Sequence, residues 1–386
     1  MGNLGVNYQV RRYLGMDKNA DLPVSVSEWR EEAKKKMSPE AWSYLEGSAG
    51  SESTERGNES SMERYRLRPR YLRNVENCDL SSEFLGKKHK FPVALAPIGV
   101  TSIINEGAEV AIGKAAQNLG IPFALSTVSS KSIEEVAAAV PDAEKWFQLY
   151  PGKDPDVMKS FIRRAEKSGY SAIVVTVDTT MLGWRERDLK LSYLPFLKGY
   201  GLANFLSDPE FRNLLDKPPQ EDIKAAIMKF SDIYVNPAFS WDNLKEIVGL
   251  TKLPVILKGV THIDDVNQAF NLGVRAVVIS NHGGRQVDGA ISSIDALYEI
   301  WKNWDIKGEI MFDSGIRHAS DIVKAITMGA SAVLIGRTYC YALAVAGQRG
   351  IEAYMNQLLS ELNLQMALAG NSCIQDLRNG EIYIKN

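Results

Sequence analysis

Short apolar runs recur eight times between Phe91 and Arg337, and each run is followed by a polar or glycine-containing turn. The runs are "FPVALAP", "IPFALST", "KWFQLY", "SAIVVTVD", "LPVILKG", "RAVVISNHGG", "GEIMFDSG" and "SAVLIGR". Between them lie patterns typical of amphipathic helices, such as "PDVMKSFIRRAEKSG" and "HASDIVKAITMG", which close with a glycine suited to a helix C-terminus. Alternating strands and helices predict an α/β fold with a parallel sheet. Eight such units favour a closed (βα)8 TIM barrel over an open sheet.

Two segments fall outside this repeat. Residues 1–90 hold an N-terminal helical segment, Val26 to Ser48, and then a polar connection; Ser27 is its predicted N-cap, and Pro39 begins a second helix. Residues 91–386 form the predicted barrel, which is interrupted after the fourth run by an insertion at about 189–253. Loops of this length tend to be lids, binding loops or assembly surfaces, so we expect a lid or an assembly loop here.

The composition narrows the classes of partner and compartment. A formal net charge of -2 gives no reason to expect nucleic acid as a partner. Cys78, Cys340 and Cys373 are far apart and form no C-x-x-C pair, so neither a disulfide framework nor a metal site is indicated, and a cytoplasmic location fits. The N-terminal stretch lacks the apolar core of a secretion signal, and no run reaches the roughly 18 apolar residues of a membrane span.

Polar groups follow nearly every predicted strand. In a barrel of this kind the C-terminal ends of all the strands face one mouth, where the site is built. A purely structural barrel would not need such a rim, so the sequence predicts a shared site. Its candidate residues are Pro97 to Gly99, Ser126, Gln148, Tyr150, Thr176, Asp178, Lys258, Ser280 to Arg285, Asp313 to Arg317, Gly336 and Arg337.

The last two strand ends indicate a phosphate. "FDSGIRHASD" and "LIGRTYC" both place glycine and arginine where barrels commonly hold a phosphate on backbone N–H groups and a helix N-terminus. A phosphate-bearing cofactor is therefore predicted. The alternative is a pair of ordinary strand-to-helix turns with solvent-exposed arginines.

Three kinds of side chain near the mouth have both a functional and a structural interpretation. His282 is either a structural histidine or a base whose ring Asp178 orients. Arg185 and Arg285 could grip a carboxylate as planar forks, or pair with Glu186 or Asp188 at the surface. The lysine that ends "VILK", Lys258, either meets an anion or extends to solvent.

These residues also carry a family resemblance. "SNHGGRQVDGA" resembles the signature of the FMN-dependent α-hydroxy acid oxidases and dehydrogenases. "WSYLEGSAG", "RPRYL", "FPVALAPIG", "WFQLY", "VTVDTTMLGWRERDLK", "VILKGV", "FDSGIRHASDIVKA" and "LIGR" follow in the family's order, so the resemblance covers nearly the whole chain. One H-x-x-R motif alone would carry little weight, but so many motifs in register are specific.

The resemblance implies a role for each position that matches. His282 matches the catalytic base and Asp178 its partner. Arg185 and Arg285 match a carboxylate clamp, with Tyr44 and Tyr150 as hydroxyl donors to the substrate. The positions that match contacts to the flavin ring are Ala96, Pro97, Ile98, Gly99, Ser126, Gln148, Thr176 and Lys258, with Ser280 beside them. The positions that match contacts to the FMN phosphate and ribose are Asp313, Gly315, Arg317, Gly336 and Arg337.

The implied reaction is the oxidation of a 2-hydroxy acid, L-lactate, by oxygen. The insertion is similar to that of the lactate 2-monooxygenase branch, and Gly99 stands where the family's oxidases usually have alanine. We interpret the missing methyl as room in which pyruvate stays while peroxide attacks it, which gives acetate, carbon dioxide and water. Val128 stands where many members have an aromatic residue, so the range of substrate side chains is open.

Other interpretations remain. An oxidase would release pyruvate and hydrogen peroxide, and a quinone-linked dehydrogenase would use another electron acceptor. Removal of the hydroxyl proton by His282 with hydride transfer, and removal of the Cα proton, are both open. An FMN-dependent isomerase of the isopentenyl diphosphate type has no need of the two arginines, and a non-catalytic barrel has no need of His282. The family resemblance further implies a homotetramer or a homo-octamer.

Overall fold

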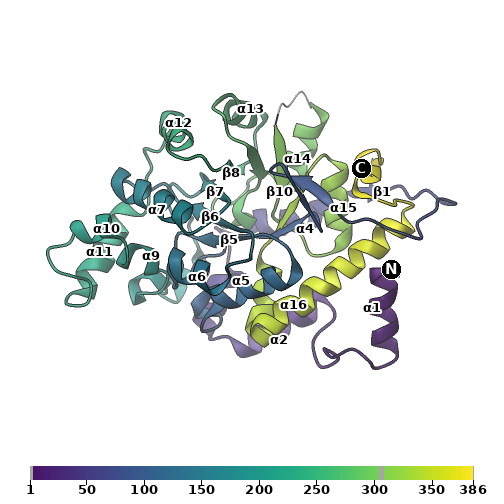
Figure 1. Ribbon diagram of the computed structural model, residues 1–386, viewed down its shortest axis with the longest axis horizontal. Coiled ribbons are helices and arrows are strands. Elements are labelled where there is room, and N and C mark those ends of the chain that lie inside the picture. Colours follow the sequence, from purple (N-terminus) through teal and green to yellow (C-terminus); the bar gives the residue numbers. More distant parts are fainter. Residues whose placement is uncertain (1–2, 304–307, 386) are drawn as a thin grey trace.

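Eight parallel strands close into a barrel in the computed structural model, which describes residues 3–303 and 308–385 (Figure 1). The strands are β4 (Val93–Leu95), β5 (Phe123–Ser126), β6 (Lys145–Leu149), β7 (Ala172–Thr176), β8 (Val255–Val260), β9 (Ala276–Ile279), β10 (Glu309–Phe312) and β11 (Val333–Ile335). They pair in chain order, and β11 returns to pair with β4. All eight correspond to the apolar runs of the sequence, so the predicted TIM barrel is confirmed.

The strands are buried on both faces, which explains their unbroken apolar composition. Successive side chains of a strand point to opposite faces, so alternate residues fill the barrel interior. Small residues such as Ala94, Ala124 and Ala172 contribute to this interior together with the large ring of Trp146. The other face of each strand packs under the surrounding helices and joins the main hydrophobic core.

The helices that follow the strands lie around the outside of the barrel. They are α5 (Ala108–Leu119), α6 (Ile133–Ala139), α7 (Pro155–Lys167), α12 (Trp241–Leu250), α13 (Ile263–Asn271), α14 (Ser293–Lys302), α15 (Ala319–Thr327) and α16 (Arg337–Leu368). Gly169, Gly273 and Gly329 each have a positive φ just after α7, α13 and α15, which confirms the predicted C-terminal glycines. The helix α16 contains a break at Ala346 and Gly347.

The N-terminal segment supplies four helices before the barrel: α1 (Leu4–Tyr13), α2 (Val26–Lys36), α3 (Pro39–Glu46) and α4 (Ser53–Met62). The predicted N-cap at Ser27 is wrong, because the helix begins two residues earlier than expected. Ser25 accepts the Glu28 N–H, and Glu28 bonds back to it in a capping box, so Ser27 lies inside the first turn. Pro39 does begin α3, behind the cap residue Ser38.

The C-terminal end of the chain forms a two-stranded sheet with a segment that lies between the N-terminal helices and the barrel. A short strand β1 (Tyr65–Leu67) pairs with β12 (Ile382–Ile384), which follows the helix α17 (Ile374–Arg378). No helix in the part of the chain that the structure describes combines the length and the apolarity needed to span a membrane.

A hairpin seals the end of the barrel opposite the predicted site. Its strands are β2 (Ser82–Phe84) and β3 (Lys87–His89). Phe84 packs edge-on against Trp146 inside the barrel, and His89 stacks on the outer face of the Phe84 ring at 3.6 Å between centroids. The Ser82 hydroxyl donates to the carbonyl of Ser331, just before β11, which places the hairpin at the N-terminal ends of the strands.

We expect Phe84→Ala to destabilise the protein by about 3–5 kcal/mol, because it removes a ring that is 1% exposed and leaves a cavity below Trp146. Equilibrium unfolding in urea would measure the loss. The exposed Tyr71 offers a control, since Tyr71→Ala removes an aromatic ring that buries little surface. A loss below about 1 kcal/mol for Phe84→Ala would mean that the hairpin does not hold the barrel end closed.

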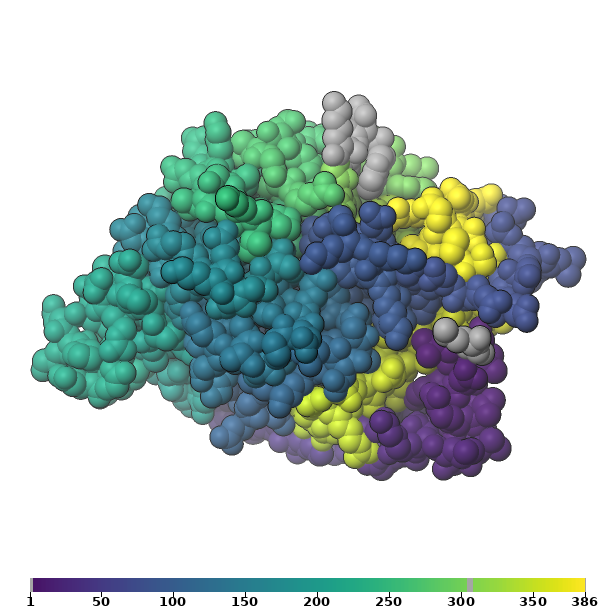
Figure 2. All heavy atoms as spheres, in the orientation of Figure 1, coloured from purple at the N-terminus to yellow at the C-terminus, as the bar shows by residue number. Residues whose placement is uncertain are grey.

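The insertion after β7 folds into short helices around aromatic side chains. Its elements are α8 (Glu186–Lys190), η2 (Pro195–Lys198), α9 (Ala203–Leu206), α10 (Pro209–Asn213) and α11 (Ile223–Ile233). Phe205 contacts the rings of Phe211 and Phe230, and Phe196 contacts Phe230 and Tyr234. In Figure 1 the helices α9, α10 and α11 lie at the left end of the molecule, which is the teal region at the left of Figure 2. The helix α12, which the sequence placed in the insertion, takes the position of the fourth barrel helix before β8.

Candidate active site

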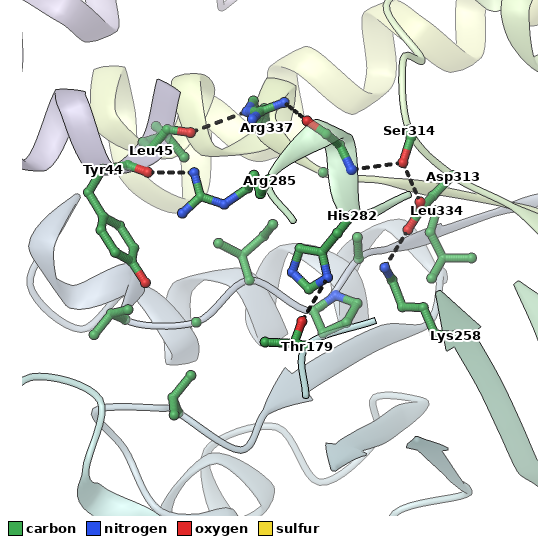
Figure 3. Close-up of a pocket in the computed structure, with 18 of the residues that line it drawn as sticks. Tyr44, Leu45, Thr179, Lys258, His282, Arg285, Asp313, Ser314, Leu334 and Arg337 are labelled. Atoms are coloured by element: carbon green, nitrogen blue, oxygen red, sulfur yellow. Dashed lines mark hydrogen bonds and ion pairs between the residues drawn. The ribbon is translucent and has the colours of Figure 1, made fainter. Parts of the chain in front are cut away.

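A cavity with about 1130 Å³ of empty space lies at the C-terminal mouth of the barrel (Figure 3). Residues that follow β4, β5, β6, β7, β9, β10 and β11 line it, together with Lys258 of β8 and residues of α3 and of the insertion. The sequence-predicted residues in its wall are Tyr44, Ala96, Pro97, Ile98, Gly99, Tyr150, Arg185, Lys258, His282, Arg285, Asp313, Gly315, Arg317, Gly336 and Arg337. The structure therefore brings together residues that are up to 293 positions apart, from Tyr44 to Arg337.

Five predicted residues lie behind this wall. Ser126 donates to Gln148 at 3.0 Å, and Gln148 donates to Thr176 at 3.1 Å, so a buried chain of hydrogen bonds links the ends of β5, β6 and β7. Ser280 accepts a hydrogen bond from Lys258, and Asp178 lies behind His282. These hydrogen bonds connect the ends of neighbouring strands and hold the residues that line the cavity in fixed positions relative to one another.

The turn after β9 aims His282 at the cavity. His282 has φ +57°, a conformation that side chains rarely adopt, and its N–H donates to the Ser280 hydroxyl at 3.1 Å. Gly283 and Gly284 continue the turn with positive φ; a Cβ on Gly284 would lie 2.6 Å from the backbone nitrogen of Glu55 in α4. Only glycine fits there. The apolar strand β9 is thus a buried support, and the turn "NHGGR" that follows it directs the side chain of His282 into the cavity.

His282 and Asp178 form a partly buried pair. The Nδ1 atom of His282 lies 2.7 Å from the Oδ1 atom of Asp178, which also accepts from Thr179. Burial lowers the pKa of His282 below its ordinary value, although Asp178 acts to raise it. Burial opposes ionisation of Asp178, but His282 and Lys258 hold its pKa below the ordinary value. The carboxylate therefore keeps the proton on Nδ1 and leaves Nε2 as the acceptor.

The pH dependence follows from the direction of these shifts. A base works in its neutral form, so we expect kcat/KM to be full near pH 7 and to fall only as the pH drops through a His282 pKa below about 6.5. Asp178→Asn should lower the rate about 10²- to 10⁴-fold and move this acidic limb to lower pH, because it removes the charge that raises the His282 pKa. Steady-state rates across the acidic range would show both effects, with the exposed Asp232→Asn as control.

Two arginines lie beside this pair, Arg185 buried and Arg285 partly buried. Arg285 donates from Nη1 to the carbonyls of Tyr44 and Gly47 at 2.7 and 2.5 Å. Arg185 donates to the Arg285 carbonyl, and both guanidinium groups lie over the Tyr44 ring at 5.9 and 5.1 Å. The surface pairing with Glu186 or Asp188 is not formed: among the described residues neither arginine has a carboxylate partner. Burial and the neighbouring Arg185 lower the pKa of Arg285 to about 9. Asp188 acts on the charge of both arginines but forms no ion pair with either among the described residues.

Lys258 is held inside the barrel mouth. Its Nζ atom lies 2.9 Å from the Oδ2 atom of Asp313 and 3.0 Å from the Ser280 hydroxyl. Burial opposes its charge, but Asp313 and Asp178 raise its pKa above the ordinary value. The alternative in which this lysine reaches solvent is therefore wrong, since its side chain is buried and ion-paired.

The opposite end of the cavity suits a phosphate. Gly336 precedes α16 without a side-chain cap, so the first N–H groups of a long helix are open to the cavity. A Cβ on Gly336 would meet only Ile98 and Ala96, at 3.9 and 4.0 Å, so a ligand can approach the backbone closely. Arg317 and Arg337 line the same end. Helix amides and two guanidinium groups are the donors that a phosphate monoester requires.

Comparison with known proteins identifies the family. Residues 33–384 match the FMN-dependent dehydrogenases. The chain belongs to this family. An L-lactate oxidase of Lysinibacillus sphaericus is 38% identical over 93% of this chain and 92% of its own length. The 2-hydroxyacid oxidase 1 of Homo sapiens is 36% identical over 90% and 93%. A crystal structure of mandelate oxidase has a TM-score of 0.84 at 32% identity, with 94% of this chain and 99% of that chain covered.

The cofactor of this family is FMN, and the cavity fits it. One wall, from Ala96 to Gly99, is apolar and uncharged, as the face of a flavin ring requires. Lys258 lies where a cation can stabilise negative charge, and the glycines and arginines at the opposite end can hold the phosphate. When bound, FMN supplies an acceptor for two electrons.

The structure adds residues that the sequence did not single out. Phe196 and Tyr234 of the insertion line the cavity, and so does Thr179. Tyr234 packs edge-on against Tyr150 at 5.5 Å, and burial raises its pKa well above the ordinary value. Thr179 adjoins the predicted Asp178 and could have been found by extending that strand end, while Ser314 lies within the predicted range Asp313 to Arg317. No motif marks Phe196 or Tyr234.

The interpretation of Gly99 needs a correction. A Cβ on Gly99 would lie 2.5 Å from the Cγ2 atom of Val128, so the methyl of Val128 already fills the space that an alanine side chain would occupy. The expected extra room beside the cofactor is therefore not present. An alanine at position 99 would need the Val128 side chain to move.

Proposed function

We propose that this protein oxidises L-lactate, a small 2-hydroxy acid, with its FMN and passes the electrons to oxygen. The observation that carries the proposal is the partly buried His282–Asp178 pair, which lies beside two arginines that form no ion pair with a described carboxylate, in one cavity. A base beside an anion site is what a 2-hydroxy acid needs: one group takes the proton, and the other holds the carboxylate. The names of the relatives, lactate oxidase and 2-hydroxyacid oxidase, agree with this substrate class.

Each residue has a defined task in this reaction. Arg185 and Arg285 hold the substrate carboxylate, and the hydroxyl groups of Tyr44 and Tyr150 can donate to its oxygens. His282 accepts a proton at Nε2, and Asp178 stabilises the imidazolium that results. Burial raises the Tyr150 pKa, so its hydroxyl stays protonated and can donate.

We further propose the monooxygenase outcome, in which lactate and oxygen give acetate, carbon dioxide and water. Because Val128 fills the space beside Gly99, this glycine does not provide room for bound pyruvate. We therefore assign the retention of pyruvate to the insertion. Phe196 and Tyr234 line the cavity and contact each other, and Phe230 packs against both rings; we call this aromatic pair the roof. A roof that is held by packed rings keeps pyruvate in place until peroxide has attacked it.

The test is turnover of L-lactate in air with excess catalase, followed by quantification of acetate and pyruvate. Catalase removes free peroxide, which would otherwise decarboxylate released pyruvate. Acetate as the main product supports the monooxygenase outcome. Pyruvate as the main product would identify a peroxide-releasing oxidase. Reduction of the enzyme by lactate without reoxidation in air would point to another acceptor, such as a quinone.

We expect Phe196→Ala to increase the share of pyruvate among the products, because it removes a ring from the roof. Phe211→Ala is the matched control: it removes an equally buried ring from the same insertion, but this ring does not line the cavity. The product ratio in the presence of catalase measures the effect. Equal ratios in both variants would show that the roof does not retain pyruvate.

A further inference from the structure

The helix α4 lies directly against the phosphate end of the cavity. Gly284 and Gly315 permit this approach: a Cβ on either would lie 2.6 Å from the backbone of Glu55 or Asn58. Asn58 also exchanges two side-chain hydrogen bonds with Asn281, at 2.8 and 2.7 Å. The helix is therefore fixed to the turns after β9 and β10, and its side chains have defined positions relative to the phosphate site.

Two glutamates of this helix face Arg317. Glu55 and Glu59 are one turn apart, and both form ion pairs with the Nη2 atom of Arg317, at 3.5 and 2.5 Å. The Glu55 side chain is 22% exposed and that of Glu59 is 46% exposed, so Glu55 is the more buried of the two. The positive charge of Arg317 is therefore balanced by two carboxylates of α4.

Arg337 is bonded differently. Its guanidinium donates to the carbonyls of Leu45, Gly283 and Gly47 and to the Ser48 hydroxyl, and no carboxylate is among these partners in the described chain. Neutral acceptors fix its position and leave its charge in place. A phosphate would therefore meet Arg337, whose charge has no carboxylate partner among the described residues, and Arg317, which already forms ion pairs with Glu55 and Glu59.

We propose that Glu55, with Glu59 beside it, competes with the FMN phosphate for Arg317, so that FMN binds more tightly when Glu55 is protonated. A carboxylate and a phosphate repel each other in a partly buried site, where water screens charges poorly. Protonation removes this repulsion and frees the guanidinium for the phosphate. The inference rests on the proposed placement of the phosphate at Arg317 and Arg337.

The surroundings of Glu55 favour such a proton. The charged groups that face it are Glu59 on α4, Arg317 after β10 and Arg337 at the start of α16, while Tyr341 and Tyr354 of α16 approach Arg317. Burial, and then Glu59, raise the pKa of Glu55 above its ordinary value, although both arginines oppose the shift. Glu55 thus keeps a proton to a higher pH than an exposed glutamate, and its contribution to FMN affinity is lost as the pH rises through that pKa.

The test compares FMN affinity in the full-length protein and its variants. Diluted holoenzyme releases FMN, and the fluorescence of the free flavin gives the dissociation constant between about pH 5.5 and about pH 9. The phosphate itself ionises near pH 6 and changes affinity in every variant, so the ratio of variant to parent at each pH isolates the glutamate. Riboflavin, which lacks the phosphate, serves as the control ligand. Glu63→Gln serves as the control variant, since it removes one charge at the exposed end of α4.

We expect Glu55→Gln to bind FMN about tenfold more tightly than the parent near pH 8, with the ratio approaching one at low pH. Glu59→Gln should show the same direction, and riboflavin affinity should not change in any variant. Weaker or unchanged FMN binding in Glu55→Gln near pH 8 would overturn the proposal, because the glutamates would then position Arg317 or have no part in binding. An equal gain for riboflavin would overturn it as well.

Arg337→Met separates this inference from the site assignment on which it rests. If Arg337→Met abolishes the preference for FMN over riboflavin while Glu55→Gln has no effect, competition by Glu55 is refuted and the phosphate site stands. If Arg337→Met keeps the full preference for FMN, the phosphate lies elsewhere and both are refuted.

Discussion

His282→Asn is expected to abolish turnover of L-lactate while the protein retains its fold and its FMN. The loss should be about two to four orders of magnitude in kcat, the contribution of a positioned general base. Asparagine suits the test because it tolerates the positive φ of this position and its amide can still donate to Asp178. The substitution removes the Nε2 atom of His282, which is the proposed proton acceptor. Anaerobic reduction of the enzyme by lactate, followed at the flavin absorbance band, isolates this step from reoxidation.

His262→Asn is the matched control for this variant. His262 is exposed and caps α13, a role that asparagine can also fill, so the same substitution there should leave kcat unchanged. Near-normal reduction of His282→Asn by lactate would remove the histidine from the reaction and favour a binding barrel without catalysis.

Arg285→Met is expected to lower kcat/KM for L-lactate by about two to three orders of magnitude, since the loss of one partner of a buried charge pair costs about 2–5 kcal/mol. Methionine keeps much of the volume and removes the charge. The effect should lie mainly in KM, because the clamp holds the carboxylate before and during the reaction. Arg285→Lys should recover only part of the loss, since a lysine cannot form the planar fork.

Arg187→Met controls for the loss of a positive charge at the same end of the barrel. Arg187 lies in α8 beside Arg185, and its salt bridge with Glu52 is partly exposed. We expect less than a threefold change there, in keeping with the small free energy of about 0–1 kcal/mol for such pairs. An equal loss in both arginine variants would indicate a general electrostatic attraction of lactate, and the carboxylate clamp would be refuted.

The barrel and most of its site were predictable because their signals are local. Each strand is a short apolar run, and its last residues must reach the mouth, so His282, Lys258 and Arg337 could be placed together without any knowledge of packing. The predicted start of α2 was wrong by two residues because Ser25 and Ser27 are both plausible N-caps. Only the pair of hydrogen bonds between Ser25 and Glu28 decides between them.

Contacts between distant segments could not be predicted in this way. The collision between a Cβ on Gly99 and Val128 depends on how the ends of β4 and β5 pack, and it reversed the interpretation of that glycine. Phe196 and Tyr234 reach the cavity only because the insertion folds back over the mouth. The pairing of Glu55 with Arg317 joins residues 262 positions apart, and no spacing in the sequence reveals it.

The backbone of His282 has a thermodynamic consequence for the whole molecule. A histidine held at φ +57° costs about 1–2 kcal/mol relative to a relaxed conformation, a cost that glycine would not incur and asparagine would incur only in part. An asparagine variant, which relaxes the backbone and can still donate to Asp178, should therefore melt at a temperature no lower than that of the parent, whereas a glycine variant leaves the Asp178 carboxylate without its partner and should melt at a lower one. The histidine is thus held against its own backbone preference by the packing of the surrounding turn, which is a local stability cost of directing its ring into the cavity.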